Sequence, residues 1–349
     1  MKTITIGMAH HTDYDGFYFS IQDILKEIRF NDREDLLNRL EFIVVENDPE
    51  SVHAKAVKNS SLSFGLGDKI RIIDFSDSKG TSATRNKIIE EARTDFVLVM
   101  DCHVLLCPVV ETLDKLFKFI DEYPDTKNLY QGPLVHDNLS KFSTHFNNEW
   151  GSGMWGRWGS AWSCKCKKTN FSIINDNSNC KYVELSTQKE IKECNFCYSK
   201  FNAISYYGHE TMLRNQGHKE LGPDPEDECF EIFSQGLGLF FTSKEHWLGF
   251  NQHSFGFGGE ECYIHEKYRK NGRRTICLPF LRWLHRFNRP SGVPYELNLE
   301  NKIRNYLLEF KELGLDIEPV RIHFVDELKY DNGNFENILK EVNVIYGEK

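Results

Sequence analysis

Short apolar runs alternate with amphipathic stretches along the first 120 residues of the chain. Apolar runs bounded by polar residues are typical of buried strands, and amphipathic stretches of about ten to fifteen residues are typical of helices. This order predicts βαβ units and a mainly parallel sheet with helices on both faces. The expected strands are residues 2–9, 40–47, 68–75 and 95–101, and the expected helices are residues 17–40, 82–93 and 108–123.

The alternation is lost between residues 130 and 230, where Gly, Trp, Asn, Cys and Lys are frequent. This change predicts an insertion. Beyond it we expect strands at residues 235–243, 274–280 and 320–325, and helices at residues 260–271, 297–313 and 334–342. The predicted organisation is an α/β catalytic domain over residues 1–290, with the insertion at 140–230 inside it and a C-terminal helical extension over 291–349.

Composition narrows the class of protein. The 349 residues are 40% apolar and 27% charged, with 43 Lys and Arg against 52 Asp and Glu, which excludes collagen, coiled coils and disordered chains. The first residues are too polar for a signal peptide, which predicts a cytoplasmic location, or the host cytoplasm for a viral protein. The most apolar stretch, residues 96–110, is interrupted by Asp101 and His103, so no membrane-spanning helix is expected.

Two polar side chains follow the predicted strand at residues 95–101. Asp101 and His103 are two positions apart, so on an extended segment they project from the same side and can chelate one cation. A polar strand end without a ligand is the alternative interpretation. A Gly-rich loop at residues 254–261 and the later His285 are the downstream features that favour a metal site.

Three segments, residues 83–103, 235–261 and 265–287, together resemble the GT-A glycosyltransferases. The resemblance is to the family 2-like enzymes, and most closely to the polypeptide N-acetylgalactosaminyltransferase-like branch. It implies a Rossmann-like GT-A fold and a UDP-sugar donor. It also implies that Asp101, His103 and His285 hold Mn²⁺ or another divalent cation, which would stabilise the charge on the departing nucleoside diphosphate.

The same resemblance implies a set of donor-binding residues. Arg85 corresponds to an arginine near the donor, and Phe257 stands where the family places an aromatic ring against the sugar. A solvated strand end and a β-bulge are the alternative interpretations for the acidic and glycine positions. The predicted donor-binding residues are Glu46, Asp48, Arg85, Asp101, Gly238, Phe257 and Gly258.

The two glutamates of the Gly-rich loop bear on the mechanism. In relatives that invert the anomeric centre, the position of Glu261 is a carboxylate that acts as general base, whereas the retaining branch has asparagine there. The resemblance therefore implies inversion, with Glu261 as base and Glu260 holding acceptor or sugar hydroxyls. An acidic side chain in the first turn of a helix is the alternative interpretation of Glu261.

Four cysteines in the irregular middle of the chain form a second candidate metal site. Their CxC and CxxC spacing suits a structural tetrahedral Zn²⁺, held by Cys164, Cys166, Cys194 and Cys197. Cys180 or His209 could replace one ligand, and buried thiols or disulfides are the alternatives.

The acceptor is the least determined part of the prediction. Trp150, Trp155, Trp158 and Trp162 lie near lysines and arginines, a mixture that can stack on bases, grip sugar rings or pack a small core. Similar enzymes that modify phage DNA make hydroxymethylpyrimidine in DNA the leading hypothesis, with protein or polysaccharide acceptors as alternatives. Two other classes stay open: an Fe(II) oxygenase, which usually has an all-β core, and a non-catalytic zinc-stabilised binding module.

Overall fold

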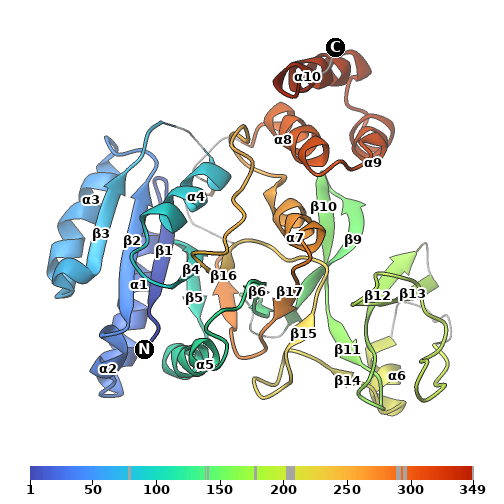
Figure 1. Cartoon of the computed structure of the whole chain (residues 1–349), viewed down its shortest axis with the longest axis horizontal. Coiled ribbons are helices and arrows are strands. Elements are labelled where there is room, and N and C mark those ends of the chain that lie inside the picture. Colours follow the sequence, from blue (N-terminus) through green and yellow to red (C-terminus); the bar gives the residue numbers. More distant parts are fainter. Residues whose placement is uncertain are drawn as a thin grey trace.

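The computed structural model describes residues 1–77, 80–137, 139, 141–176, 179–201, 209–287, 292–293 and 297–347. Its centre is an eight-stranded sheet in the order β15, β17, β6, β16, β4, β1, β2, β3 (Figure 1). These strands are β1 (Ile4–His10), β2 (Leu40–Glu46), β3 (Ile70–Asp74), β4 (Phe96–Asp101), β6 (Leu129–Gln131), β15 (Phe230–Glu231), β16 (Leu239–Ser243) and β17 (Thr275–Cys277).

The half of the sheet formed by β4, β1, β2 and β3 is parallel, and β16 runs antiparallel to β4. Val, Ile, Leu and Phe dominate these strands because helices cover both faces. One face packs on α1 (Tyr14–Phe30), α3 (Val52–Ser61) and α5 (Val109–Glu122), and the other on α4 (Thr81–Glu91) and α7 (Glu260–Lys270). The short α2 (Glu34–Leu37), η1 (Leu62–Phe64) and η2 (Gly67–Lys69) complete this part.

The expected α/β class is therefore confirmed. The four predicted N-terminal strands are β1 to β4 in chain order, and the predicted helix at residues 260–271 is α7. The helix expected over residues 17–40 is divided into α1 and α2, and α3 was not predicted. Three Lys and Asn residues in α3 weaken its apolar periodicity, and only a few of its side chains are buried against the sheet.

The middle of the chain forms separate antiparallel sheets. A long ribbon of β9 (His145–Gly151) and β10 (Met154–Gly159) leads to a four-stranded sheet in the order β13, β12, β11, β14 (Figure 1). The latter consists of β11 (Ala161–Ser163), β12 (Asn170–Asp176), β13 (Asn179–Glu184) and β14 (Lys219–Glu220), with α6 (His209–Asn215) beside it. Another sheet joins β5 (Val104–Leu106), β18 (Trp283–His285), β7 (Leu134–Val135) and β8 (Phe142–Ser143). The division of the chain at 290 stays a prediction.

The strand expected at residues 320–325 is wrong. This segment is helical, and the C-terminal part consists of α8 (Leu299–Glu312), α9 (Glu318–Arg321), a π-helical segment (Ile322–Glu327) and α10 (Asn332–Ile345). Val320, His323 and Phe324 are buried at helical spacing, whereas Ile322 is 41% exposed; a strand would have buried positions 320, 322 and 324. Within the described residues, no helix combines the length and apolarity needed to cross a membrane.

The position of α4 depends on the glycine in the middle of β1. An added Cβ at Gly7 would lie 2.1 Å from Cγ2 of Ile88, so glycine lets this helix approach the strand closely. Ile88 is fully buried between the strands and the helix. Because α4 also carries Arg85, the same contact fixes the height of that side chain above the sheet.

A double-mutant cycle tests this packing. We expect Gly7→Ala to lower the free energy of unfolding by about 1–3 kcal/mol through overpacking. Ile88→Ala removes the clashing methyl group and should cost about 2–5 kcal/mol alone. The double variant should lose less free energy of unfolding than the two single variants together. We expect the difference, measured by urea unfolding, to exceed about 0.5 kcal/mol. Strict additivity would contradict the proposed contact.

Candidate functional site

A cavity of about 480 Å³ opens at the carboxyl ends of β1, β2 and β4. Ligands commonly bind at this edge of an α/β sheet because the strand ends and helix N-termini converge there. The loop at residues 255–257 and the start of α8 form the opposite wall. The lining residues are Ala9, His10, His11, Asp13, Asn47, Gly80, Thr81, Thr84, Arg85, Asp101, Cys102, His103, Phe255, Gly256, Phe257, Asn298 and Asn301.

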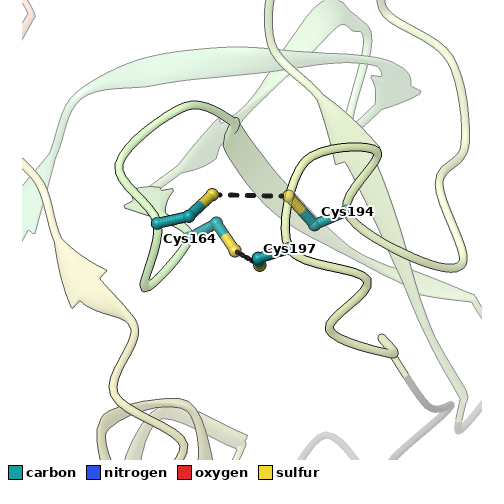
Figure 2. Close-up of side chains that lie close together, drawn as sticks. Cys164, Cys194 and Cys197 are labelled. Atoms are coloured by element: carbon teal, nitrogen blue, oxygen red, sulfur yellow. Dashed lines mark hydrogen bonds between the residues drawn. The ribbon is translucent and has the colours of Figure 1, made fainter.

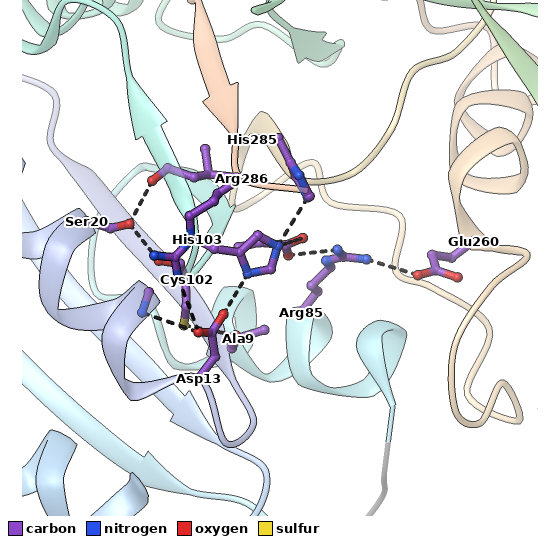
Figure 3. Close-up of polar contacts among 12 residues, drawn as sticks. Ala9, Asp13, Ser20, Arg85, Cys102, His103, Glu260, His285 and Arg286 are labelled. Atoms are coloured by element: carbon purple, nitrogen blue, oxygen red, sulfur yellow. Dashed lines mark hydrogen bonds and ion pairs between the residues drawn. The ribbon is translucent and has the colours of Figure 1, made fainter. Parts of the chain in front are cut away.

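Asp101, His103 and His285 converge beside this cavity. Nε2 of His103 lies 3.2 Å from Nε2 of His285 and 3.9 Å from Oδ2 of Asp101, and the three ligand atoms are all within 4.8 Å of one another. The two rings meet edge to face (Figure 3). One carboxylate and two imidazoles at these distances are a donor set that fits a divalent transition-metal ion such as Mn²⁺.

Asp13 orients His103 from behind. Its Oδ2 lies 2.8 Å from Nδ1 of His103, and its Oδ1 lies 3.8 Å from the guanidinium of Arg286 (Figure 3). An Nδ1–H donated to Asp13 leaves the Nε2 lone pair directed at His285, as in many metal sites where a carboxylate fixes the tautomer of a ligand. Sequence reasoning missed Asp13, although its position just after β1 places it at the same sheet edge as Asp101.

The turn between β4 and β5 is anchored at two points. The hydroxyl of Ser20 lies 2.6 Å from the carbonyl oxygen of Cys102 and 2.8 Å from that of Val104. The Cys102 thiol donates to the carbonyl of Ala9 on β1 at 3.2 Å (Figure 3). Buried hydrogen bonds of this kind fix the directions of the two ligands.

Arg85 links this group to the Gly-rich loop. Its guanidinium donates to Oδ1 of Asp101 at 2.9 Å and to Oε1 of Glu260 at 3.1 Å, and Thr81 also donates to Glu260 (Figure 3). Arg85 is 4% exposed and Glu260 is 1% exposed. Burial alone would lower the pKa of Arg85, but the charges of Asp101 and Glu260 outweigh it and raise that pKa.

The same charges act on Asp101. Burial raises the pKa of its carboxyl, and the attraction of Arg85, followed by that of His103 and His285, more than reverses this effect. The pKa of Asp101 is therefore lowered. An ionised carboxylate is the form that can bind a cation.

The pKa values of Glu261 and Glu309 are shifted in the opposite direction, upwards. Burial, followed by repulsion from Glu260, raises the pKa of Glu261 to about 7. Glu309 on α8 is 1% exposed, and burial together with Glu260 and Glu261 raises its pKa well above the usual range. Its Oε2 has no hydrogen-bond partner within the described residues, which fits a neutral carboxylic acid. Neither Glu260 nor Glu261 lines the cavity described above.

Neither of the two predicted acidic donor residues, Glu46 and Asp48, lines the cavity. Glu46 is fully buried, where it pairs with Nδ1 of His10 and accepts the backbone N–H of Asp48. The residues that line the cavity at this point are His10 and Asn47. Nε2 of His10 is buried and has no hydrogen-bond partner in the described part of the chain. Sequence reasoning missed His10 because β-strand ends do not reveal which side chain faces the ligand.

The glycine and aromatic positions also have defined places. Gly238 packs against Trp283 and His285, and its carbonyl accepts the N–H of Asp101 at 2.8 Å. Phe257 lines the cavity, and the Gly258 carbonyl accepts a hydrogen bond from Asn305 on α8.

The Gly-rich loop touches the start of α4 directly. Gly80 and Gly256 form a β-bridge, and a Cβ at Gly80 would lie 2.5 Å from the Gly256 carbonyl oxygen. A side chain at this position would therefore separate the two segments. The contact brings Glu260 within reach of Arg85 and Thr81.

The tryptophans of the middle segment mainly pack cores. Trp150 and Trp155 contact the C-terminal helices, and Trp162 is 1% exposed beneath the four-stranded sheet. Trp158 is 37% exposed and packs on Phe146. Core packing is therefore the interpretation that fits Trp150, Trp155 and Trp162.

Comparisons with known proteins bear on the class of protein that this fold and site indicate. The model of glycosyl transferase family 2 matches residues 20–169. No curated protein matches the chain. GalNAc-T7, solved with UDP, GalNAc and Mn²⁺, is 12% identical and superposes with a TM-score of 0.55 over 98% of this chain and 55% of that chain. The chain thus spans about half the length of GalNAc-T7.

Two further solved structures are similar at lower scores. TarS of S. aureus with UDP-GlcNAc is 12% identical, with a TM-score of 0.48 over 97% of this chain and 80% of that chain. The mannosyltransferase PcManGT of Pyrobaculum calidifontis, with GDP-Man and Mn²⁺, is 12% identical, with a TM-score of 0.45 over 98% and 70%.

The predicted GT-A architecture is confirmed by the fold, and the predicted resemblance is confirmed by the family 2 match. Residues 20–169 thus match the model of glycosyl transferase family 2, and the fold is of the GT-A type. The oxygenase alternative is disfavoured, because its usual all-β core differs from the α/β sheet found here.

The charge balance around Arg85 can be tested by unfolding. Arg85→Met should destabilise the protein by about 3–5 kcal/mol, because Glu260 and Asp101 would be left as buried, unpaired charges. Arg85→Met combined with Glu260→Gln should recover part of that loss in urea unfolding. Lys87→Met on the same helix removes only partly exposed ion pairs with Glu90 and Glu91, so it should cost less than about 1 kcal/mol. Equal losses for Arg85→Met and Lys87→Met would contradict this account.

Proposed function

We propose that this chain transfers a sugar from a UDP-sugar to an acceptor hydroxyl, with a divalent cation, Mn²⁺, held by Asp101, His103 and His285. The observation that carries the proposal is the convergence of these three side chains at the edge of a cavity of about 480 Å³. When bound, the cation would neutralise charge on the diphosphate leaving group. Asp101, Arg85 and Asp13 prepare the site for it, since each holds its neighbour in a fixed direction.

The cavity floor fits the base of a nucleoside diphosphate. Because Glu46 is paired with Nδ1 of His10, this nitrogen carries the proton and the buried Nε2 is left as an acceptor. Uracil presents an N–H donor on its pairing edge, which such an acceptor can read. We infer that Glu46 contributes to donor binding through His10, and that Asn47 flanks the same base or its ribose.

Glu261 is our candidate for the general base. It would take the proton of the acceptor hydroxyl while that oxygen attacks the anomeric carbon from the face opposite UDP. The bond to UDP then breaks, and UDP leaves with the electron pair, so the configuration inverts. A pKa of about 7 suits a base at neutral pH. Glu260, which is tied to Arg85 and Thr81, is better suited to holding Arg85 than to binding an acceptor itself.

We keep hydroxymethylpyrimidine in DNA as the proposed acceptor. Residues 161–221 contain nine Lys and Arg against six Asp and Glu, although the whole chain is acidic. Phe196 and Tyr198 are 57% and 73% exposed there, and Lys168 lies over the Phe196 ring. Exposed rings beside cations can stack on bases and meet phosphates. A protein or polysaccharide acceptor is the alternative outcome of the test below.

Release of UDP tests the proposal. The wild-type protein is incubated with Mn²⁺ and a panel of UDP-sugars, with and without hydroxymethylated DNA. Asp101→Asn should reduce UDP release by at least about 100-fold, since even outer partners of a metal site cost 10–100-fold. Asp95→Asn is the matched control, because Asp95 lies beside the opposite end of the same strand.

The possible outcomes of this experiment test the proposed donor and the proposed acceptor separately. Release that requires both Asp101 and the modified DNA supports the whole proposal, and chelation should then abolish it. Release that DNA does not stimulate keeps the transferase and overturns the DNA acceptor. Silence with every donor would overturn the transferase and return the binding module to consideration.

The pH profile tests Glu261. A base acts only when it is deprotonated, so kcat/KM should rise as the pH increases to about 7 and level off above it. Glu261→Gln should lose about 10²–10⁴-fold in rate and also lose this limb of the profile. Glu266→Gln, on the same helix and paired with Arg269, should leave the profile unchanged. Full activity in Glu261→Gln would rule out the assignment.

A further inference from the structure

Two loops of the four-stranded sheet bring four thiols to one point. Cys164 and Cys166 follow β11, and Cys194 and Cys197 lie in the segment between β13 and α6 (Figure 2). All four sulfur atoms lie within 4.8 Å of one another. Cys180 and His209, considered as alternative ligands, are not part of this group.

The sulfur separations match a shared metal ion. Sγ of Cys164 lies 3.4 Å from Sγ of Cys197, and Sγ of Cys166 lies 3.6 Å from Sγ of Cys194 (Figure 2). Thiolates around a tetrahedral Zn²⁺ are about 3.8 Å apart, since each Zn–S bond is about 2.3 Å. A disulfide requires about 2.05 Å. All ten cysteines are described, and all ten are free thiols.

The two loops also share one backbone design. In each, the N–H of the first cysteine donates to the carbonyl five residues later: Cys164 to Thr169 at 2.8 Å, and Cys194 to Ser199 at 2.9 Å. The residue directly after each second cysteine is left-handed, with φ of 61° at Lys167 and 56° at Tyr198. Such a conformation is uncommon for residues other than glycine, so its recurrence indicates two turns shaped for the same purpose.

Two hydroxyl groups of these turns lie beside sulfur atoms of the group. Oγ1 of Thr169 lies 3.3 Å from Sγ of Cys194, and Oγ of Ser199 lies 3.2 Å from Sγ of Cys197. Hydroxyl donors at these positions can satisfy sulfur lone pairs that remain when thiolates share one ion.

The unit around the thiols needs such support. Among the described residues, its core contains seven buried ones, of which two are cysteines of the group: Trp162, Cys164, Phe171, Tyr182, Cys194, Phe201 and Leu213. A unit of this size buries little apolar surface, and small units are commonly held by a metal or by disulfides. The ligands come from two turns that are far apart in the sequence, at residues 164–166 and 194–197.

We propose that Cys164, Cys166, Cys194 and Cys197 bind one structural Zn²⁺ that joins the turn after β11 to the turn before α6. The site is separate from the Asp101 group and does not depend on the proposed transferase activity. Without the ion, the turn after β11 and the turn that carries Cys194 would lose this link between them.

Metal content of the full chain tests the proposal. Protein purified without chelator should hold about one equivalent of zinc. Cys194→Ser should lose it, whereas Cys180→Ser, a buried cysteine of the same sheet outside the group, should keep it. Asp101→Ala should also keep it, which separates this ion from one bound at the other site. Zinc in Cys194→Ser, zinc lost only in Asp101→Ala, or iron in place of zinc would each overturn the assignment.

A second measurement covers the case in which Cys194→Ser does not fold. A mercurial titration of the wild-type protein should release the zinc with about four thiols. Cobalt exchanged into the wild-type protein should give intense tetrahedral d–d bands and thiolate charge transfer, and removal of the metal should lower Tm. Octahedral cobalt spectra, or disulfides among these cysteines, would overturn the proposal.

Discussion

The site depends above all on one buried guanidinium. Arg85 joins Asp101 at the end of β4 to Glu260 at the start of α7, two segments that are far apart in the sequence. Removing three charges from water is costly, so the arrangement is stable only while each charge is paired. The backbone brings these charged groups together. Gly7 lets α4 approach the sheet closely, and the contact between Gly80 and Gly256 holds the Gly-rich loop beside the start of α4.

The carboxylates around Arg85 differ in their pairing and pKa, so they are suited to different roles. Asp101 is kept ionised by Arg85 and the two histidines, which suits a metal ligand. Glu260 is paired with Arg85, and burial together with the nearby charge of Glu260 raises the pKa of Glu261 to about 7. Neighbouring acids whose pKa values are pushed apart can take different roles in one reaction. The geometry thus explains why Glu261, rather than Glu260, is the better candidate for the base.

The sequence predicted the parts of the fold that follow from local periodicity. The strands from β1 to β4 and helix α7 were identified because long apolar runs and polar breaks mark them. Residues 320–325 were assigned as a strand because alternating apolar residues imitate one, while tertiary packing selected Val320 and Phe324 at helical spacing. The family resemblance grouped Asp101, His103 and His285, and these three side chains lie close together in the structure. It could not show that Glu46 faces inwards, since that depends on its pairing with His10.

The two proposed metal sites differ in donor chemistry, and this difference bears on how one chain could keep two ions apart. Four thiolates select Zn²⁺, whereas one carboxylate with two imidazoles at a cavity accepts Mn²⁺ and similar ions. The first set supplies the four ligands of a complete tetrahedral shell, and the second supplies only three and leaves room for an incoming diphosphate. A structural ion in the thiol site would therefore persist while the catalytic ion exchanges with each donor. Such a separation would let the sheet of β11 to β14 stay folded irrespective of the state of the active site.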